Sequence, residues 1–127
     1  MNGWIGVDLD GTLAVYEPGD GVYHTDGKVK IGPPVQVMVR RVKWWLHQGY
    51  RIKIMTARVC GLYSKNEADI VDGTMQSKAI EAWCLEHLGR VLEVTALKDF
   101  HMKELYDDRA YNVVRNQGAV WMDGVKT

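Results

Sequence analysis

Residues 5–12, which read IGVDLDGT, decide the fold of this chain. The short apolar run over residues 5–9 predicts a buried strand, and Asp8 and Asp10 lie at its carboxyl end. Gly11-Thr12 then breaks the strand as a turn. We therefore expect two carboxylates at the edge of a sheet, where the first strand ends.

Strands and helices alternate along the chain that follows. Residues 33–48 carry apolar side chains at helical spacing, which predicts an amphipathic helix that ends at Gly49. A second amphipathic helix is predicted over residues 79–88, and further strands over residues 50–55, 91–95, 102–106 and 113–114. Short links between such elements are typical of an α/β protein with a central parallel sheet, so we expect a Rossmann-like three-layer sandwich.

Residues 13–32 are rich in turn-forming residues. We expect Val22-Tyr23 to pair with residues 28–31 as a small hairpin around Asp26-Gly27. Such a hairpin would form a short flap just beyond the acidic end of the first strand.

Two other segments are less regular. In residues 59–73, Ser64 and Glu67 have the spacing of a capping box, which predicts the start of a short helix. Asp72-Gly73 is expected to interrupt that helix. Residues 115–127 are expected to form a last turn and a tail.

Composition limits the class of protein. A chain of 127 residues and 14.4 kDa fits one domain, residues 1–127. Its 16 basic and 16 acidic residues cancel, which argues against broad electrostatic binding to nucleic acid or to an anionic membrane. The two cysteines, Cys60 and Cys84, form no metal-ligand spacing or disulfide framework. We expect a cytosolic protein, because no signal peptide or membrane-spanning run is recognisable.

Polar side chains recur where the predicted strands end. They are Asp8, Asp10, Thr56, Lys98, Asp107 and Asp108. Ligands of open α/β sheets bind beyond the carboxyl ends of the strands, so these side chains are expected to converge on one crevice.

Clustered carboxylates repel one another and persist only with a cation or with shared protons. An all-oxygen ligand set suits Mg²⁺ better than zinc. Thr56, Lys98 and the backbone amides of residues 10–12 could hold an anion beside that metal. A metal, an anion cradle and an acidic group together indicate phosphoryl transfer.

The motifs resemble those of the haloacid-dehalogenase-like superfamily, over about residues 4–114. Residues 8–12, DLDGT, look like the first motif of that family and Thr56 like the second. Lys98 resembles the third motif, and Asp107-Asp108 resembles the fourth. The order of the four motifs along a chain of alternating strands and helices is stronger evidence for the resemblance than any single motif.

The resemblance implies a two-step phosphatase reaction. Asp8 would attack phosphorus and form an aspartyl-phosphate, and Asp10 would act as general acid and then as general base. The implied phosphate-binding residues are Gly11, Thr12, Thr56, Ala57 and Lys98. Arg58 and Arg109 have two open interpretations, which are contact with substrate phosphate and a structural salt bridge.

The resemblance also implies Mg²⁺ as cofactor. Its ligands would be Asp8, the carbonyl of Asp10, and Asp107 or Asp108, between which the sequence does not decide. Lys98 is favoured over Lys103 for the third motif, because Lys103 lies within a predicted strand.

The chain is too short for the full cap domain that many family members carry, so we expect a minimal, capless member. An open site suits a polymeric substrate or closure by a second copy in a homo-oligomer. The pattern is similar to small phosphatase-like proteins of bacteriophages, to phosphatase domains acting on nucleic-acid 3′ ends and to deoxynucleotidases. The implied partner is a phosphorylated small molecule, a nucleotide or a nucleic-acid end.

Other functions fit less well. A response-regulator receiver has its acidic pair and its acceptor aspartate in the opposite order along the chain. A P-loop kinase needs a glycine-rich motif that this sequence lacks. A metal-dependent nuclease would use clustered carboxylates without needing Thr56 and Lys98. The alternative that stays open is a catalytically silent relative that binds a partner.

Overall fold

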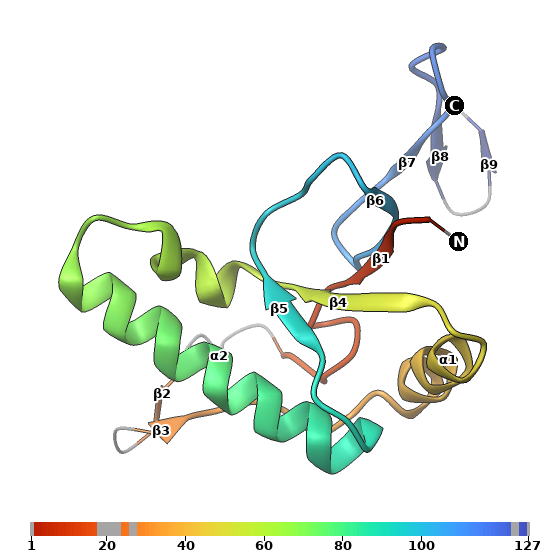
Figure 1. Cartoon of the computed structure of the whole chain (residues 1–127). Coiled ribbons are helices and arrows are strands. Elements are labelled where there is room, and N and C mark those ends of the chain that lie inside the picture. The colour runs from red at the N-terminus through yellow and green to blue at the C-terminus, as the bar shows by residue number, and fades with distance from the viewer. Residues whose placement is uncertain (1, 18–23, 26–27, 123–124, 127) are drawn as a thin grey trace.

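The computed structural model describes residues 2–17, 24–25, 28–122 and 125–126. Its main sheet has four parallel strands in the order β5-β4-β1-β6 (Figure 1). These strands are β1 (Trp4–Val7), β4 (Arg51–Met55), β5 (Glu93–Thr95) and β6 (Met102–Tyr106). Helix α1 (Gln36–His47) connects β1 to β4, and the 3₁₀ helix η1 (Ala57–Tyr63) and α2 (Glu67–Leu88) connect β4 to β5. The predicted α/β class with a central parallel sheet is confirmed.

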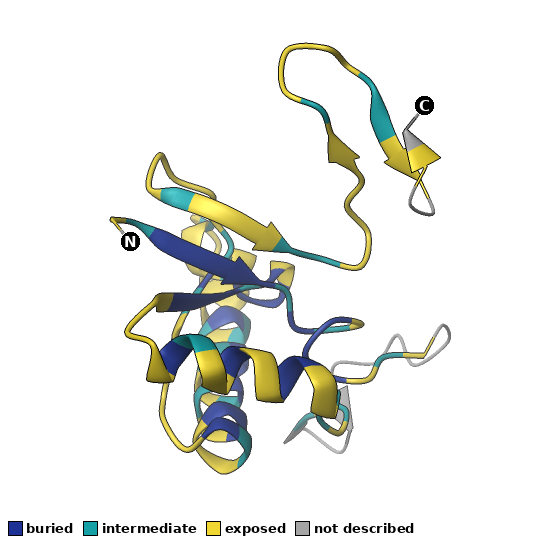
Figure 2. Cartoon of the chain, turned by 90° about the vertical axis from the view of Figure 1, so that its right-hand side faces the viewer, coloured by how far each residue is buried: buried dark blue, intermediate teal, exposed yellow. Residues whose placement is uncertain are grey.

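One face of this sheet carries the hydrophobic core. Ile5 and Val7 of β1 and Ile52 and Ile54 of β4 point to that face and are buried there. They pack in one cluster with apolar side chains of both α-helices, which are Met38, Val39, Val42, Leu46, Ile80, Trp83, Cys84 and Leu88. Burial of each large side chain contributes about 1.5–3 kcal/mol, so this cluster fixes the helices against the sheet. Figure 2 shows β1 buried along its length and β6 largely exposed.

The opposite face of the sheet carries polar contacts around Trp4 instead of this apolar cluster. Lys53 lies 4.5 Å from the ring centroid of Trp4 and forms a 2.9 Å salt bridge with Glu93. Trp4 Nε1 donates to Asp99 in the connection from β5 to β6. That connection is too short to contain a crossover helix. In the described residues both α-helices therefore pack on one face, and the second helical layer of the expected sandwich is not found there.

The predicted flap is present in part. Strands β2 (His24–Thr25) and β3 (Lys28–Val29) pair antiparallel. Val22-Tyr23 and the Asp26-Gly27 turn lie outside the described residues. The chain after β3 returns beside the first motif, where Val15 N donates to Pro33 O and Val35 N donates to Leu13 O, both at 2.8 Å.

Helix α2 differs from its prediction in two ways. Asn66, and not Ser64, caps its first turn, because Asn66 Oδ1 accepts from Ala68 N at 2.9 Å and from Asp69 N at 3.2 Å. The helix also continues through Gly73, so the predicted interruption is wrong. A side chain at Gly73 would meet Leu62 N at 2.7 Å. The glycine therefore permits close packing between α2 and η1 where we expected a break.

The carboxyl-terminal segment also differs. Instead of a tail, it forms a three-stranded antiparallel sheet of β7 (Asn112–Val113), β8 (Val120–Met122) and β9 (Val125–Lys126). Asn116 and Gly118 adopt positive φ angles of 62° and 72°, which lets the chain reverse between β7 and β8. The predicted fifth strand thus joins this sheet and not the central one. None of the described helices is long and apolar enough to cross a membrane.

Candidate active site

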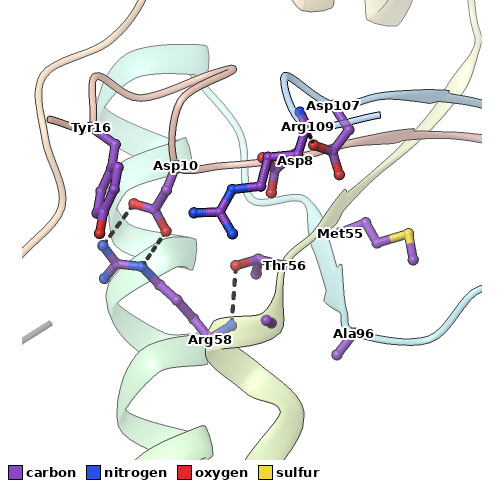
Figure 3. Close-up of a pocket in the computed structure, with 10 residues that line it drawn as sticks. Asp8, Asp10, Tyr16, Met55, Thr56, Arg58, Ala96, Asp107 and Arg109 are labelled. Atoms are coloured by element: carbon purple, nitrogen blue, oxygen red, sulfur yellow. Dashed lines mark hydrogen bonds and ion pairs between the residues drawn. The ribbon is translucent and has the colours of Figure 1, made fainter. Parts of the chain in front are cut away.

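The carboxyl ends of β1, β4 and β6 meet at one edge of the sheet, as the sequence predicts, and border a cavity of about 300 Å³ (Figure 3). Its lining residues are Asp8, Asp10, Tyr16, Met55, Thr56, Ala57, Arg58, Ala96, Asp107 and Arg109. Four of the predicted strand-end residues therefore line one cavity, namely Asp8, Asp10, Thr56 and Asp107.

A tight turn after β1 holds the two acids of the first motif. Leu9 O accepts from Leu13 N at 3.0 Å and from Ala14 N at 2.8 Å. The amides expected to bind phosphate are used inside the same turn. Gly11 N donates to Ala14 O at 2.8 Å, and Thr12 N donates to Leu9 O at 3.3 Å. The structure thus gives these two amides a role in shaping the turn and not in an anion cradle.

Gly11 and Thr12 instead position Asp108. Thr12 Oγ1 donates to Asp108 Oδ1 at 3.0 Å, and Asp108 N donates to Thr12 Oγ1 at 3.0 Å. Gly11 has a φ of +88°, and a Cβ there would lie 2.5 Å from Asp108 Oδ2. Only a glycine therefore lets the carboxylate approach the turn this closely.

Three carboxylates gather at this point. One oxygen from each of Asp8, Asp107 and Asp108 lies within 4.8 Å of the others. Burial, together with the like charge of Asp107 and a hydrogen bond with Asp108, raises the pKa of Asp8 from 3.8 to about 7. A divalent cation would offset this repulsion, and an all-oxygen donor set of this size fits Mg²⁺. The side chain of Asp10 is not part of the cluster.

Asp10 is bound to Arg58 instead. Arg58 Nε donates to Asp10 Oδ2 at 2.7 Å, and Arg58 Nη2 donates to Asp10 Oδ1 at 2.8 Å. Arg58 Nη1 donates to Gln76 Oε1 of α2 at 3.2 Å. Of the two open interpretations of Arg58, the geometry matches the salt bridge.

Thr56 ends β4 and caps η1. Its N–H donates to Thr95 O at 2.9 Å, and its Oγ1 accepts from Arg58 N at 3.2 Å. The side chain is buried and lines the cavity, as does the next residue, Ala57. Both residues therefore line the same cavity as Asp8 and Asp107.

Lys98 is not brought to the cavity. It is exposed and is absent from the cavity lining. Asp99 accounts for this placement, because its Oδ1 accepts from Trp4 Nε1 and from His101 N, each at 2.8 Å. These bonds hold the connection from β5 to β6 beside the far end of β1. The competing Lys103 is exposed on β6 and does not line the cavity either.

Arg109 lines the cavity and its guanidinium points into it (Figure 3). Its backbone N–H donates to Asp107 Oδ1 at 2.8 Å, which fixes the loop that follows β6. The side chain is exposed and forms no ion pair within the described residues. Arg109 is thus the cation of the lining that is not already paired with a carboxylate.

No protein-family model, curated protein or solved structure matches this chain.

Sequence reasoning missed some residues of the site. Met55 and Ala96 were not predicted to line the cavity, and Gln76 was not singled out. A signal for Gln76 does exist, because it follows Gly73 by three residues and precedes the buried Ile80 by four. A polar residue on the buried stripe of a helix needs a polar partner, and here that partner is Arg58.

Proposed function

We propose that this chain is a magnesium-dependent phosphohydrolase of the haloacid-dehalogenase-like kind, which acts on phosphate monoesters through Asp8. The observation that carries the proposal is the cluster of Asp8, Asp107 and Asp108 beside a cavity that also contains Asp10 and Thr56. Perturbed acids beside a cavity are characteristic of functional sites.

The first step is attack of an Asp8 carboxylate oxygen on phosphorus. An O–P bond forms to Asp8, the bond from phosphorus to the leaving oxygen breaks, and Asp10 gives its proton to that oxygen. In the second step water attacks the aspartyl-phosphate and Asp10 accepts a proton from the water. Phosphate leaves, and Asp8 is restored as a carboxylate.

Asp8, Asp107 and Asp108 would hold Mg²⁺, which when bound offsets the charge of the transferring phosphoryl group. Asp107 lines the cavity, whereas Asp108 is not among the lining residues and is held by Thr12. Of the two, Asp107 would therefore be the metal ligand that also faces a bound substrate.

Arg109 takes the role that the sequence suggested for Lys98. It lines the cavity, whereas Lys98 does not. The hydroxyl of Thr56 and the guanidinium of Arg109 would bind the phosphoryl oxygens and stabilise charge that develops on them.

The size of the cavity favours small substrates. About 300 Å³ is at the lower end of the range for small-molecule sites, so it suits a phosphorylated small molecule or the terminal nucleotide of a strand. A zero net charge likewise supplies no general attraction for long nucleic acid.

The proposal is tested by phosphate release from purified protein in Mg²⁺ and in EDTA, with Asp8→Asn in parallel. The substrates are p-nitrophenyl phosphate, deoxynucleoside monophosphates, sugar phosphates and a 3′-phosphorylated oligonucleotide. We expect turnover that requires Mg²⁺ and is lost in Asp8→Asn. Binding of Mg²⁺ without turnover of any substrate would instead favour the catalytically silent relative.

A further inference from the structure

Arg58 connects the proposed acid–base group to the helical layer. Two of its nitrogens donate to the two oxygens of Asp10, at 2.7 and 2.8 Å, and a third donates to Gln76 at 3.2 Å. This fork-to-fork pairing fixes the plane of the carboxylate as well as its position.

Burial makes this chain of contacts rigid. Arg58 is 8% exposed and Gln76 is 1% exposed, so neither side chain is placed to exchange its partners for water. A buried guanidinium needs such partners, because donors that are buried and left unpaired destabilise the folded state. Asp10 itself is more accessible, with 17% of its side chain exposed, and it lines the cavity.

The contact to Gln76 depends on close packing between η1 and α2. A side chain at Gly61 would collide with Asp69 O, and one at Gly73 would lie 2.7 Å from Leu62 N. The two glycines therefore let the helices approach. Gln76 follows Gly73 by nearly one turn, which brings it to the side of α2 that faces Arg58.

Asp10 keeps the capacity to meet a substrate while it is held in this way. A carboxylate has about four lone-pair sites, and the two hydrogen bonds from Arg58 occupy two of them. One of the other sites can carry the proton that Asp10 gives to the oxygen of a leaving group in the cavity.

We propose that Arg58 is a positioning residue for the acid–base chemistry of Asp10, and that Gln76 anchors it from α2. This inference rests on the proposed function. Arg58 acts through Asp10, so its removal should impair proton transfer to the leaving group more than binding of phosphate.

Two substrates with different leaving groups separate these effects. p-Nitrophenolate leaves with little help from an acid, whereas an alkoxide leaves slowly unless it is protonated. We would measure kcat and KM for p-nitrophenyl phosphate and for an alkyl phosphate in wild type, Arg58→Met, Arg58→Lys and Gln76→Met. Arg51→Ala, which removes an exposed arginine paired with Glu93, is the control.

We expect Arg58→Met to lower kcat/KM for the alkyl phosphate by about 10²–10⁴-fold and kcat/KM for p-nitrophenyl phosphate by less than about tenfold. Arg58→Lys should restore little of this loss, since an ammonium cannot form the two-pronged contact. Gln76→Met nearly preserves side-chain volume, so it keeps the test usable if Arg58 variants fail to fold. Gln76→Met should lower kcat/KM for the alkyl phosphate more than kcat/KM for p-nitrophenyl phosphate, with a smaller difference between the two substrates than in Arg58→Met. Arg51→Ala should lower kcat/KM for neither substrate.

The result that overturns the inference is an equal loss of kcat/KM for both substrates. Since kcat/KM covers the steps up to departure of the leaving group, and not the later hydrolysis that both substrates share, this pattern would assign Arg58 to binding of substrate phosphate. Wild-type turnover of both substrates shows in the same experiment that the proposed function holds. Wild-type protein that turns over neither substrate would overturn the function and the inference together.

Discussion

Thr12 and Asp108, 96 positions apart in the sequence, exchange two hydrogen bonds of 3.0 Å each. The hydroxyl donates to the carboxylate, and the amide of Asp108 donates to the hydroxyl. This pair joins the turn after β1 to the loop after β6 and fixes one of the three clustered carboxylates. Partners of this kind orient metal ligands and tune their affinity.

Thr12→Val keeps the shape of the side chain and removes the hydroxyl. We expect it to weaken Mg²⁺ binding by about 10–100-fold, because Asp108 loses its orienting partner. The free energy of unfolding should fall by about 1–2 kcal/mol. Calorimetric titration with Mg²⁺ and chemical denaturation measure the two effects. Thr12→Ser, which keeps the hydroxyl, is the control, and equal Mg²⁺ affinity in the valine variant would refute this role.

Gly11→Ala is expected to abolish Mg²⁺ binding, since the new Cβ would lie 2.5 Å from Asp108 Oδ2. Gly49→Ala is a matched control, because Gly49 has the same φ of +88° and an added Cβ there meets nothing within 4 Å. Both variants lose about 1–2 kcal/mol from left-handed backbone strain. Only the Gly11 variant should lose the metal, and loss in both, or in neither, would count against the placement of Asp108.

The pH dependence of stability tests the environment of Asp8. Its pKa rises from 3.8 to about 7 in the folded protein, so between these values the folded state binds more protons than the unfolded state. The free energy of unfolding of the metal-free protein should therefore decrease as pH rises through this window. We expect a contribution of about 1–2 kcal/mol, which is less than the full shift would give because solvent screens the site.

Asp8→Asn removes that contribution. In EDTA, denaturation at pH 5 and pH 8 should show a smaller loss of stability for the variant than for wild type. At pH 8, Mg²⁺ should raise the free energy of unfolding of wild type. The expected increase is about 2.7 kcal/mol when the Mg²⁺ concentration is a hundred times its Kd. An identical pH dependence in the two proteins would show that Asp8 titrates normally.

Two substitutions test whether Arg109 or Lys98 binds the transferring phosphoryl group. Arg109→Ala is expected to lower kcat/KM by about 10²-fold, because Arg109 lines the cavity. Lys98→Ala should retain nearly all activity, because Lys98 is exposed and does not line the cavity. Steady-state kinetics on p-nitrophenyl phosphate measures both. The opposite result would mean that the connection after β5 moves toward the site when substrate binds.

The positions of Asp8, Thr56 and Asp107 could be predicted because each follows a strand of a parallel sheet. Strand ends are set by local apolar patterns, and a parallel sheet brings them to one edge. The place of Lys98 could not be predicted in this way. It lies in a connection whose path depends on the contacts of Asp99 with Trp4 and His101, which are distant in the sequence or specific to the fold.

The structural roles of Gly73 and Gln76 could not be predicted for a related reason. A glycine in a helical pattern is read locally as a break, and only the position of η1 shows that it makes room for a neighbour. Strands β8 and β9 were also unpredicted, because the reversal before β8 depends on positive φ angles at Asn116 and Gly118. Non-local contacts therefore account for Gly73 and Gln76, and an unrecognised turn accounts for β8 and β9.

If Asp8 is the nucleophile, it becomes covalently phosphorylated during turnover, and this species can be trapped. Wild-type protein would be mixed with substrate and Mg²⁺, quenched, reduced with borohydride and digested for mass spectrometry. We predict that residue 8 is recovered as homoserine, the reduction product of an aspartyl-phosphate, only with substrate and Mg²⁺ present. Turnover with an unmodified residue 8, or with the modification at Asp107 or Asp108, would exclude Asp8 as the nucleophile.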